Sequence, residues 1–184
     1  MAMLCIMLVA CGEAERNAKK DLDVAAQNDT DNLGNGELEE AETPKGLLFE
    51  VPEGFKEDEE IGGLFVSEEY TQDYACIYYQ EAAADERYSL LTEDSIEELM
   101  QEIYSDSYGI DTVVDVLDFH RFNLNGYKAY YTECEYVIDE IPMETVEYTV
   151  MVGDRAFSVT YMQKQDAGWK AAYAHSADNL AVRQ

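Results

Sequence analysis

The sequence has 184 residues, and its 40 acidic side chains against 12 lysines and arginines give a formal charge of −28 at pH 7. Such a chain repels phosphate backbones and anionic lipid headgroups, which argues against nucleic-acid binding and against membrane attachment through a basic patch. Residues 46–184 alone hold 30 acidic and 8 basic residues, so the charge belongs to the main body of the chain. It favours basic or neutral partners, which here means an envelope protein, peptide or glycan.

The chain opens with an apolar run from Met1 to Ala10 that ends at Cys11. A membrane span needs about 20 apolar residues, whereas this run has the length of the apolar part of an export signal. Leu8 to Gly12 resembles a bacterial lipobox, in which the signal is cut before a cysteine that then carries acyl chains. The resemblance implies a signal peptide at 1–10, a lipidated Cys11 and an anchor on the extracytoplasmic face of the cell membrane. The alternative is a buried N-terminal element with a chance cysteine.

One departure from the lipobox pattern is that no lysine or arginine precedes the apolar run, which a start codon further upstream would explain. Residues 11–45 contain Asn, Asp, Glu, Gly and Ala with few large apolar side chains. Such a segment buries too little surface to offset the entropy of ordering. We therefore expect a disordered acidic tether at 11–45 and a single globular domain at 46–184.

The first half of the domain predicts short strands followed by one helix. Strands are expected at 46–51, 64–69 and 74–79, with a loop at 81–91. A helix follows, which Thr92 or Asp94 can cap and which Gly109 ends. Its apolar residues recur with helical spacing and form one stripe, namely Ile96, Leu99, Met100, Ile103 and Tyr104.

The second half predicts a meander of antiparallel strands. Alternating residues indicate strands at 113–122, 127–138, 146–152 and 156–161, with a tight turn at Asn125–Gly126 and a loop at Pro142. A closing helix carries Trp169, Tyr173 and Leu180 on one side. Strands in runs with separate helices indicate an α+β fold, an antiparallel meander covered by two or more helices.

The order of these elements resembles PsbP-like lipoproteins over most of residues 46–182. The matching residues are Phe49, Val51, Pro52, Gly54 and Phe55, then Gly126, Tyr127 and Ala129, and finally Trp169, Tyr173 and the segment 176–180. The resemblance implies a PsbP-like α/β sandwich, an antiparallel sheet covered by helices. It also implies an accessory or binding role, and it supplies no catalytic residues.

Two of the four cysteines remain once the signal is removed and Cys11 is lipidated. Cys76 and Cys134 each lie in a predicted strand. Export places them where a disulfide can form, and two buried thiols are the alternative.

The sequence carries no recognisable catalytic constellation. His120 and His175 are the only histidines, and no nucleophile, zinc or phosphate-loop motif accompanies them. We therefore expect no enzyme, no cofactor and no metal. The alternative is an envelope hydrolase that uses a carboxylate pair hidden among the 40 acidic residues.

Tyrosine is the one unusual residue type, with 14 copies against 6 phenylalanines. Because tyrosine combines apolar area with a polar tip, it suits both recognition surfaces and half-exposed sheets. The sequence predicts a non-enzymatic binding face on the strands, and the alternative is that the tyrosines belong to amphipathic strands at the boundary of the core. The candidate residues are Tyr74, Tyr78, Tyr79, Tyr130, Tyr131 and Tyr136.

Overall fold

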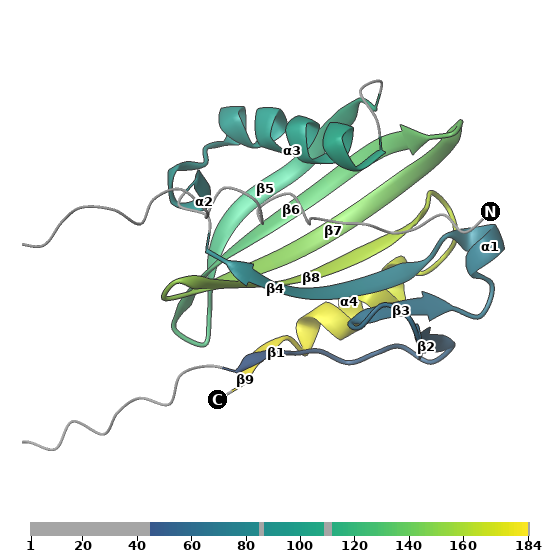
Figure 1. Ribbon diagram of the computed structural model, residues 1–184, viewed down its shortest axis with the longest axis horizontal. Coiled ribbons are helices and arrows are strands. Elements are labelled where there is room, and N and C mark those ends of the chain that lie inside the picture. Colours follow the sequence, from purple (N-terminus) through teal and green to yellow (C-terminus); the bar gives the residue numbers. More distant parts are fainter. Residues whose placement is uncertain (1–44, 85–86, 109–111, 184) are drawn as a thin grey trace, which may run out of the picture. The chain divides into compact units, whose positions relative to one another are not determined.

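A seven-stranded antiparallel sheet forms the centre of the protein (Figure 1). The computed structural model describes residues 45–183 except 85–86 and 109–111, so the predicted signal peptide, Cys11 and nearly all of the predicted tether lie outside the described residues. The strand order is β2-β3-β4-β8-β7-β6-β5, and a separate pair joins β1 to β9. No helix in the described part of the chain is both long and apolar enough to cross a bilayer.

The strands are β1 (Gly46–Leu48), β2 (Phe55–Glu57), β3 (Leu64–Ser67), β4 (Cys76–Ala83), β5 (Val114–Leu124), β6 (Tyr127–Ile138), β7 (Ile141–Val152), β8 (Arg155–Lys164) and β9 (Ala181–Arg183). The helices are α1 (Tyr70–Asp73), α2 (Arg87–Leu90), α3 (Glu93–Tyr108) and α4 (Lys170–Asp178). The predicted α+β class and antiparallel meander are confirmed.

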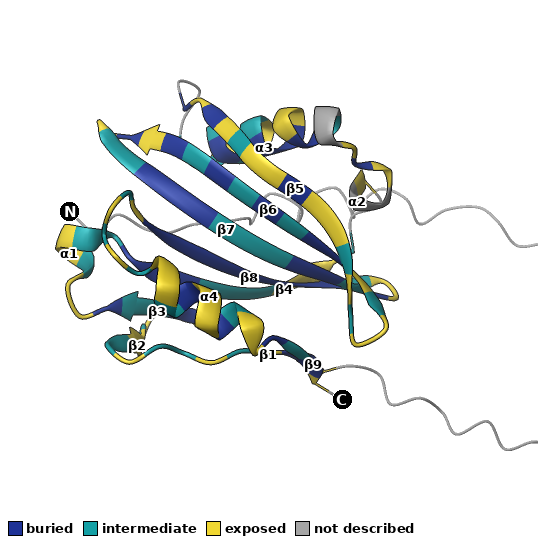
Figure 2. Ribbon diagram, turned by 180° about the vertical axis from the view of Figure 1, so that it is seen from behind, coloured by how far each residue is buried: buried dark blue, intermediate teal, exposed yellow. Residues whose placement is uncertain are grey.

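The two longer helices cover opposite faces of the sheet, as the views from front and back show (Figures 1 and 2). Tyr161 and Met162 are neighbours in β8, so their side chains point to opposite faces. Tyr161 contacts Tyr173 of α4, whereas Met162 accepts hydrogen bonds from Tyr108 of α3 and from Tyr136. We call these two sides the α4 face and the α3 face.

Helix α3 begins directly after Thr92, which is one of the two predicted cap residues. The Thr92 hydroxyl accepts the Ser95 N–H at 3.3 Å, and the Ser95 hydroxyl accepts the Thr92 N–H at 2.8 Å, a reciprocal cap. Most of the predicted stripe is buried against the sheet, with Tyr104 lying 4.5 Å from Tyr136 between ring centroids. The stripe is therefore a core face.

The α4 face holds a hydrophobic core. Its centre is the alternate residues of β4, β7 and β8, with α4 and the β1–β9 pair packed over them. Trp169, at the start of α4, packs edge-on to Phe55 at 4.7 Å and donates its indole N–H to Asp73 at 2.9 Å. The contact of Trp169 with Phe55 joins the N-terminal and C-terminal parts of the domain through two residues that carry the family resemblance.

Several element boundaries differ from the sequence prediction. The turn between β6 and β7 lies at Asp139–Glu140, where both residues have positive φ, and the predicted loop at Pro142 is wrong because Pro142 is the second residue of β7. Proline is tolerated there because its missing N–H costs little near the start of a strand. Its carbonyl still accepts the Gln165 N–H. Tyr74 ends α1 instead of beginning a strand, and α2 lies within the predicted loop at 81–91.

A bridge between Cys76 and Cys134, one of the two possibilities that the sequence leaves open, is not formed, and both side chains are buried. The sheet register places Cys76 opposite Met162, Met162 opposite Thr145 and Thr145 opposite Cys134. Neighbouring strands lie about 4.8 Å apart, so three steps put the two cysteines about 14 Å from each other. A disulfide needs Cα atoms within about 7 Å, so the alternative of two buried thiols holds for this pair.

Candidate functional site

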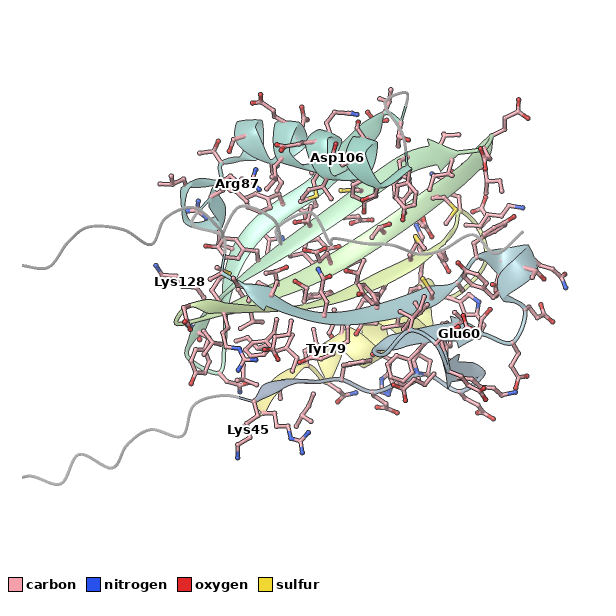
Figure 3. All side chains as sticks on the ribbon, in the orientation of Figure 1. Lys45, Glu60, Tyr79, Arg87, Asp106 and Lys128 are labelled. Atoms are coloured by element: carbon pink, nitrogen blue, oxygen red, sulfur yellow. The ribbon has the colours of Figure 1, made fainter. Side chains whose placement is uncertain are left out.

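The six tyrosines predicted as a binding face do not share one surface. Tyr79, which is labelled in Figure 3, and Tyr131 both lie on the α4 face, as the register with β8 and β7 requires. The neighbours of these two in sequence, Tyr78 and Tyr130, point to the α3 face together with the buried Tyr136. Tyr74 caps the end of α1. The single face that the prediction implied is therefore wrong, because adjacent strand residues alternate.

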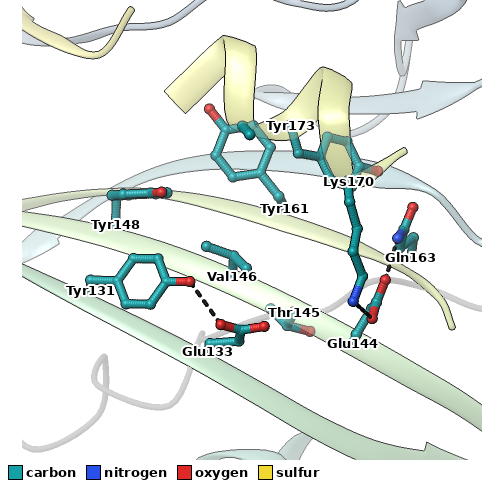
Figure 4. Close-up of a pocket in the computed structure, with 11 residues that line it drawn as sticks. Tyr131, Glu133, Glu144, Thr145, Val146, Tyr148, Tyr161, Gln163, Lys170 and Tyr173 are labelled. Atoms are coloured by element: carbon teal, nitrogen blue, oxygen red, sulfur yellow. Dashed lines mark hydrogen bonds and ion pairs between the residues drawn. The ribbon is translucent and has the colours of Figure 1, made fainter. Parts of the chain in front are cut away.

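One of the six, Tyr131, lines a pocket of about 190 Å³ on the α4 face. The pocket lies between strands β6, β7 and β8 and the first turns of α4 (Figure 4). Aromatic, acidic and basic side chains meet in it. Its lining residues are Tyr131, Glu133, Glu144, Thr145, Val146, Tyr148, Tyr161, Gln163, Lys170, Tyr173 and Ala174.

The strand register explains why the pocket has an aromatic side and an acidic side. Residues directly opposite each other in an antiparallel pair share a face and touch. Tyr131 stands opposite Tyr148, and two residues further along β6 Glu133 stands opposite Val146. Glu144, two residues before Val146 on β7, stands opposite Gln163 of β8. Its carboxylate therefore lies on the same face as Tyr148 but further along the strand.

Four tyrosines form a continuous wall from the open sheet to α4. The ring centroids lie 5.2 Å apart between Tyr131 and Tyr148, 6.1 Å between Tyr148 and Tyr161, and 5.2 Å between Tyr161 and Tyr173. Burial raises the pKa of all four phenols, that of Tyr161 to about 12. They are therefore neutral hydrogen-bond donors at physiological pH.

The wall continues onto the α4 face of the edge strand β5 through His120, whose ring stacks on Tyr131 at 4.6 Å between centroids. His120 also pairs with Asp118 at 3.1 Å, and both side chains are more than half exposed. The other histidine, His175, lies 3.6 Å from Glu50 on the outer side of α4. Neither histidine is placed beside a nucleophile by the described contacts.

The charged groups of the pocket are two carboxylates and one ammonium. Glu133 accepts a hydrogen bond from the Tyr131 hydroxyl at 2.9 Å. Glu144 is buried, accepts a hydrogen bond from Gln163 and forms an ion pair with Lys170 at 2.6 Å. At neutral pH the lining thus carries one net negative charge.

Glu133 and Glu144 occupy diagonal positions on neighbouring strands, the kind of acid pair that a hydrolase could use. Glu144, however, already holds Gln163 and Lys170. Among the described residues, no cluster of three or more His, Cys, Asp and Glu could hold a metal ion. Sequence reasoning missed Glu144, Gln163 and Lys170, since the pairing of β7 with β8 brings the first two together and the placement of α4 adds the lysine.

The arrangement defines a PsbP-like α+β sandwich with a small pocket between its sheet and its C-terminal helix. Among solved structures, cyanobacterial PsbP (CyanoP) from Synechocystis matches with a TM-score of 0.57 at 11% sequence identity, over 74% of this chain and 86% of that one. This match shows the PsbP-like fold that the resemblance in the sequence implied.

Two further structures match with lower scores. LpqN, described as involved in cell envelope biogenesis of Mycobacterium tuberculosis, matches with a TM-score of 0.48 at 11% identity, over 75% of this chain and 83% of that one. A Pseudomonas aeruginosa protein of unknown function matches with a TM-score of 0.45 at 11% identity, over 60% and 74% of the two chains. No protein-family model matches the sequence, and no curated protein matches it.

Proposed function

We propose that this protein is a lipid-anchored binding or accessory protein of the bacterial envelope, and that its ligand site is the pocket beneath α4. The observation that carries the proposal is the pocket itself, where four tyrosine rings and two carboxylates converge on one cavity. Tyrosine is enriched at recognition sites because it gives a large rigid contact area and a polar tip.

The size of the pocket limits what enters it. Its volume of about 190 Å³ is slightly larger than an engineered cavity of about 150 Å³ that holds benzene, and smaller than the 300–1,000 Å³ or so of typical ligand pockets. A glycan chain or a whole cofactor is therefore too large. The pocket takes one side chain or one small molecule, and the rest of a larger partner lies on the α4 face of β6 and of the neighbouring β5, which carries many exposed residues (Figure 2).

The pocket can be tested by capturing partners from envelope extract with the full chain carrying Cys11→Ala. Tyr148→Ala removes a central ring of the wall, and Tyr78→Ala is the matched control because Tyr78 is a half-buried tyrosine on the opposite face. Loss of a central aromatic contact typically costs 2 kcal/mol or more, so we expect Tyr148→Ala to weaken binding more than tenfold. Equal retention by both variants would exclude the pocket as the site.

The alternative activity is hydrolysis of envelope material by Glu133 and Glu144. Both oxygens of Glu144 are already engaged, one by Lys170 and the other by Gln163, so neither is free to serve as a general acid and the geometry favours binding. Purified protein is incubated with envelope glycans and peptides, and Glu133→Gln is compared with the parent. Turnover that disappears in Glu133→Gln would replace the binding proposal by an enzymatic one.

The lipid anchor is proposed from the lipobox resemblance at residues 8–12. Two or more acyl chains give firm membrane attachment, since each buried methylene contributes about 0.8 kcal/mol. Cys11→Ala should abolish both lipid modification and cleavage at this site. Labelled palmitate that still enters the Cys11→Ala protein would show that the anchor is elsewhere.

A further inference from the structure

The ion pair between Lys170 and Glu144 is asymmetric. The ammonium lies 2.6 Å from the carboxylate, but the Lys170 side chain is 68% exposed and the Glu144 side chain only 11%. The lysine belongs to the first turn of the surface helix α4, whereas the glutamate belongs to the pocket floor on β7. Separating the pair would therefore cost the buried Glu144 carboxylate more free energy than it would cost the exposed Lys170 ammonium.

Glu144 is held in a fixed orientation. The side-chain amide of Gln163 donates to Oε1 of Glu144, and the oxygen of the same amide accepts the backbone N–H of Trp169 at 2.9 Å. Gln163 is 2% exposed, so this amide cannot turn toward water. The second oxygen of Glu144, which faces Lys170, needs a cation because a buried carboxylate without a partner is strongly destabilising.

Lys170 itself loses little when another cation takes its place on Glu144. Its side chain is mostly exposed, so a released lysine regains rotamer freedom and full hydration of its ammonium. Its place on Glu144 can therefore be taken by any other cation that reaches the pocket.

The surrounding charges select a cation for that place. Glu135 stands directly opposite Glu144 in the register, and Glu133 lines the same pocket. The pKa of Lys170 is raised, chiefly by the hydrogen bond to Glu144; burial opposes this shift, and the charges of Glu144, Glu133 and Glu135 add to it. An anion at this point would face three carboxylates, whereas an ammonium or guanidinium gains from each of them.

We propose that Lys170 is a placeholder, and that the pocket binds the cationic end of a ligand whose ammonium or guanidinium replaces Lys170 on Glu144. The tyrosine wall then packs along the apolar stem that carries the cation and faces the charge with its rings. This inference rests on the proposed function, since it names the chemistry of the ligand for the same pocket. The cation can belong to a free alkylamine or to the basic side chain of a partner protein.

The test titrates the full Cys11→Ala chain with n-butylammonium, butanol and butyrate, followed by calorimetry and by NMR signals of Tyr148 and of the Lys170 ε-methylene. Lys170→Met keeps the apolar stem and removes the competitor, so butylammonium should bind about 2- to 5-fold more tightly. Glu144→Gln should weaken it about tenfold or more. Lys164→Met is the control, because Lys164 is an exposed lysine outside the pocket, and it should change nothing.

The outcomes separate the inference from the proposed function. Weaker binding of butylammonium to Lys170→Met, or butyrate binding that Lys170 supports, would overturn the placeholder while leaving the pocket as a ligand site. Titrations in which none of the three probes moves the Tyr148 signal would overturn both. If Glu144→Gln melts early, movement of the Lys170 ε-methylene in the parent protein still decides the question.

The source of the cation is found with a second pair of probes. An acetylated Gly-Lys-Gly amide that binds more tightly than butylammonium identifies a basic protein side chain as the ligand. Equal or weaker binding of the peptide identifies a free amine. Both results support displacement of Lys170, and they differ only in what displaces it.

Discussion

Ser176 joins three parts of the domain with one hydroxyl group, and its removal measures how firmly α4 is held on the sheet. The side chain is 1% exposed and donates to the carbonyl of Glu50, so the Tyr161 hydroxyl, 2.9 Å away, must be the donor in their shared hydrogen bond. In Ser176→Ala the buried Tyr161 hydroxyl loses its acceptor, and the carbonyl of Glu50, an exposed residue, loses a donor. We expect a loss of about 2 kcal/mol, since an unsatisfied buried group costs about 1–3 kcal/mol and alanine returns a few tenths in helix propensity.

The loss should lower the melting temperature by about 5–10 °C in a circular-dichroism melt of a domain of this size. Ser107→Ala is the control, because Ser107 is also a helical serine but donates only within its own helix, to Ile103 at 2.8 Å. It should stay within about 0.5 kcal/mol of the parent. Combining Ser176→Ala with Tyr161→Phe should cost less than the two changes separately, by about 1 kcal/mol. Strict additivity, or an unchanged melt for Ser176→Ala, would refute the role given to this hydroxyl.

Two further predictions concern the backbone and the buried thiol. Gly63 and Gly126 both have positive φ, but they differ in the space around them. A side chain at Gly63 would collide with the Tyr79 carbonyl, whereas Gly126 has open space. In urea unfolding, Gly63→Ala should therefore lower the free energy of unfolding by about 1–3 kcal/mol more than Gly126→Ala does. Burial, with smaller contributions from Glu147 and Glu133, raises the pKa of Cys134 to about 12 from an ordinary value of 9.0. The resulting stability is fully present below pH 9 or so and is lost toward pH 12, by up to about 1.4 kcal/mol per pH unit. Cys134→Ala should flatten this part of the curve, and parallel curves for variant and parent would contradict the assignment.

Local patterns predicted the elements that depend on neighbouring residues alone. The α3 stripe and the alternation in β6, β7 and β8 follow from side-chain periodicity, which a single sequence displays directly. The pairing of β4 with β8 and of β1 with β9 depends on contacts between residues far apart in the chain, so no local pattern contained it. The sequence does not predict the turn at Asp139–Glu140, because Pro142 is typical of a loop and draws the expected boundary past it. Proline also fits the start of a strand, which is where Pro142 lies.

The site was predicted in part. Strand alternation would have separated Tyr78 from Tyr79 and Tyr130 from Tyr131, and it would have placed Tyr131 beside Tyr148 once β6 and β7 were paired. The ion pair of Glu144 with Lys170 has no such signal in the sequence. It exists only because Trp169 and Tyr173 fix the helix over the sheet.

The pairing of β1 with β9 has a consequence for how this domain can be rearranged. The Lys45 N–H donates to the Arg183 carbonyl at 2.7 Å, so the first and last described residues are backbone neighbours. A linker of a few residues would close the domain into a ring without stretching either strand. A circular permutant opened at the exposed Asp139–Glu140 turn should therefore keep the sheet and its pocket, and the domain could equally be spliced into a surface loop of a reporter enzyme as a sensor for its ligand.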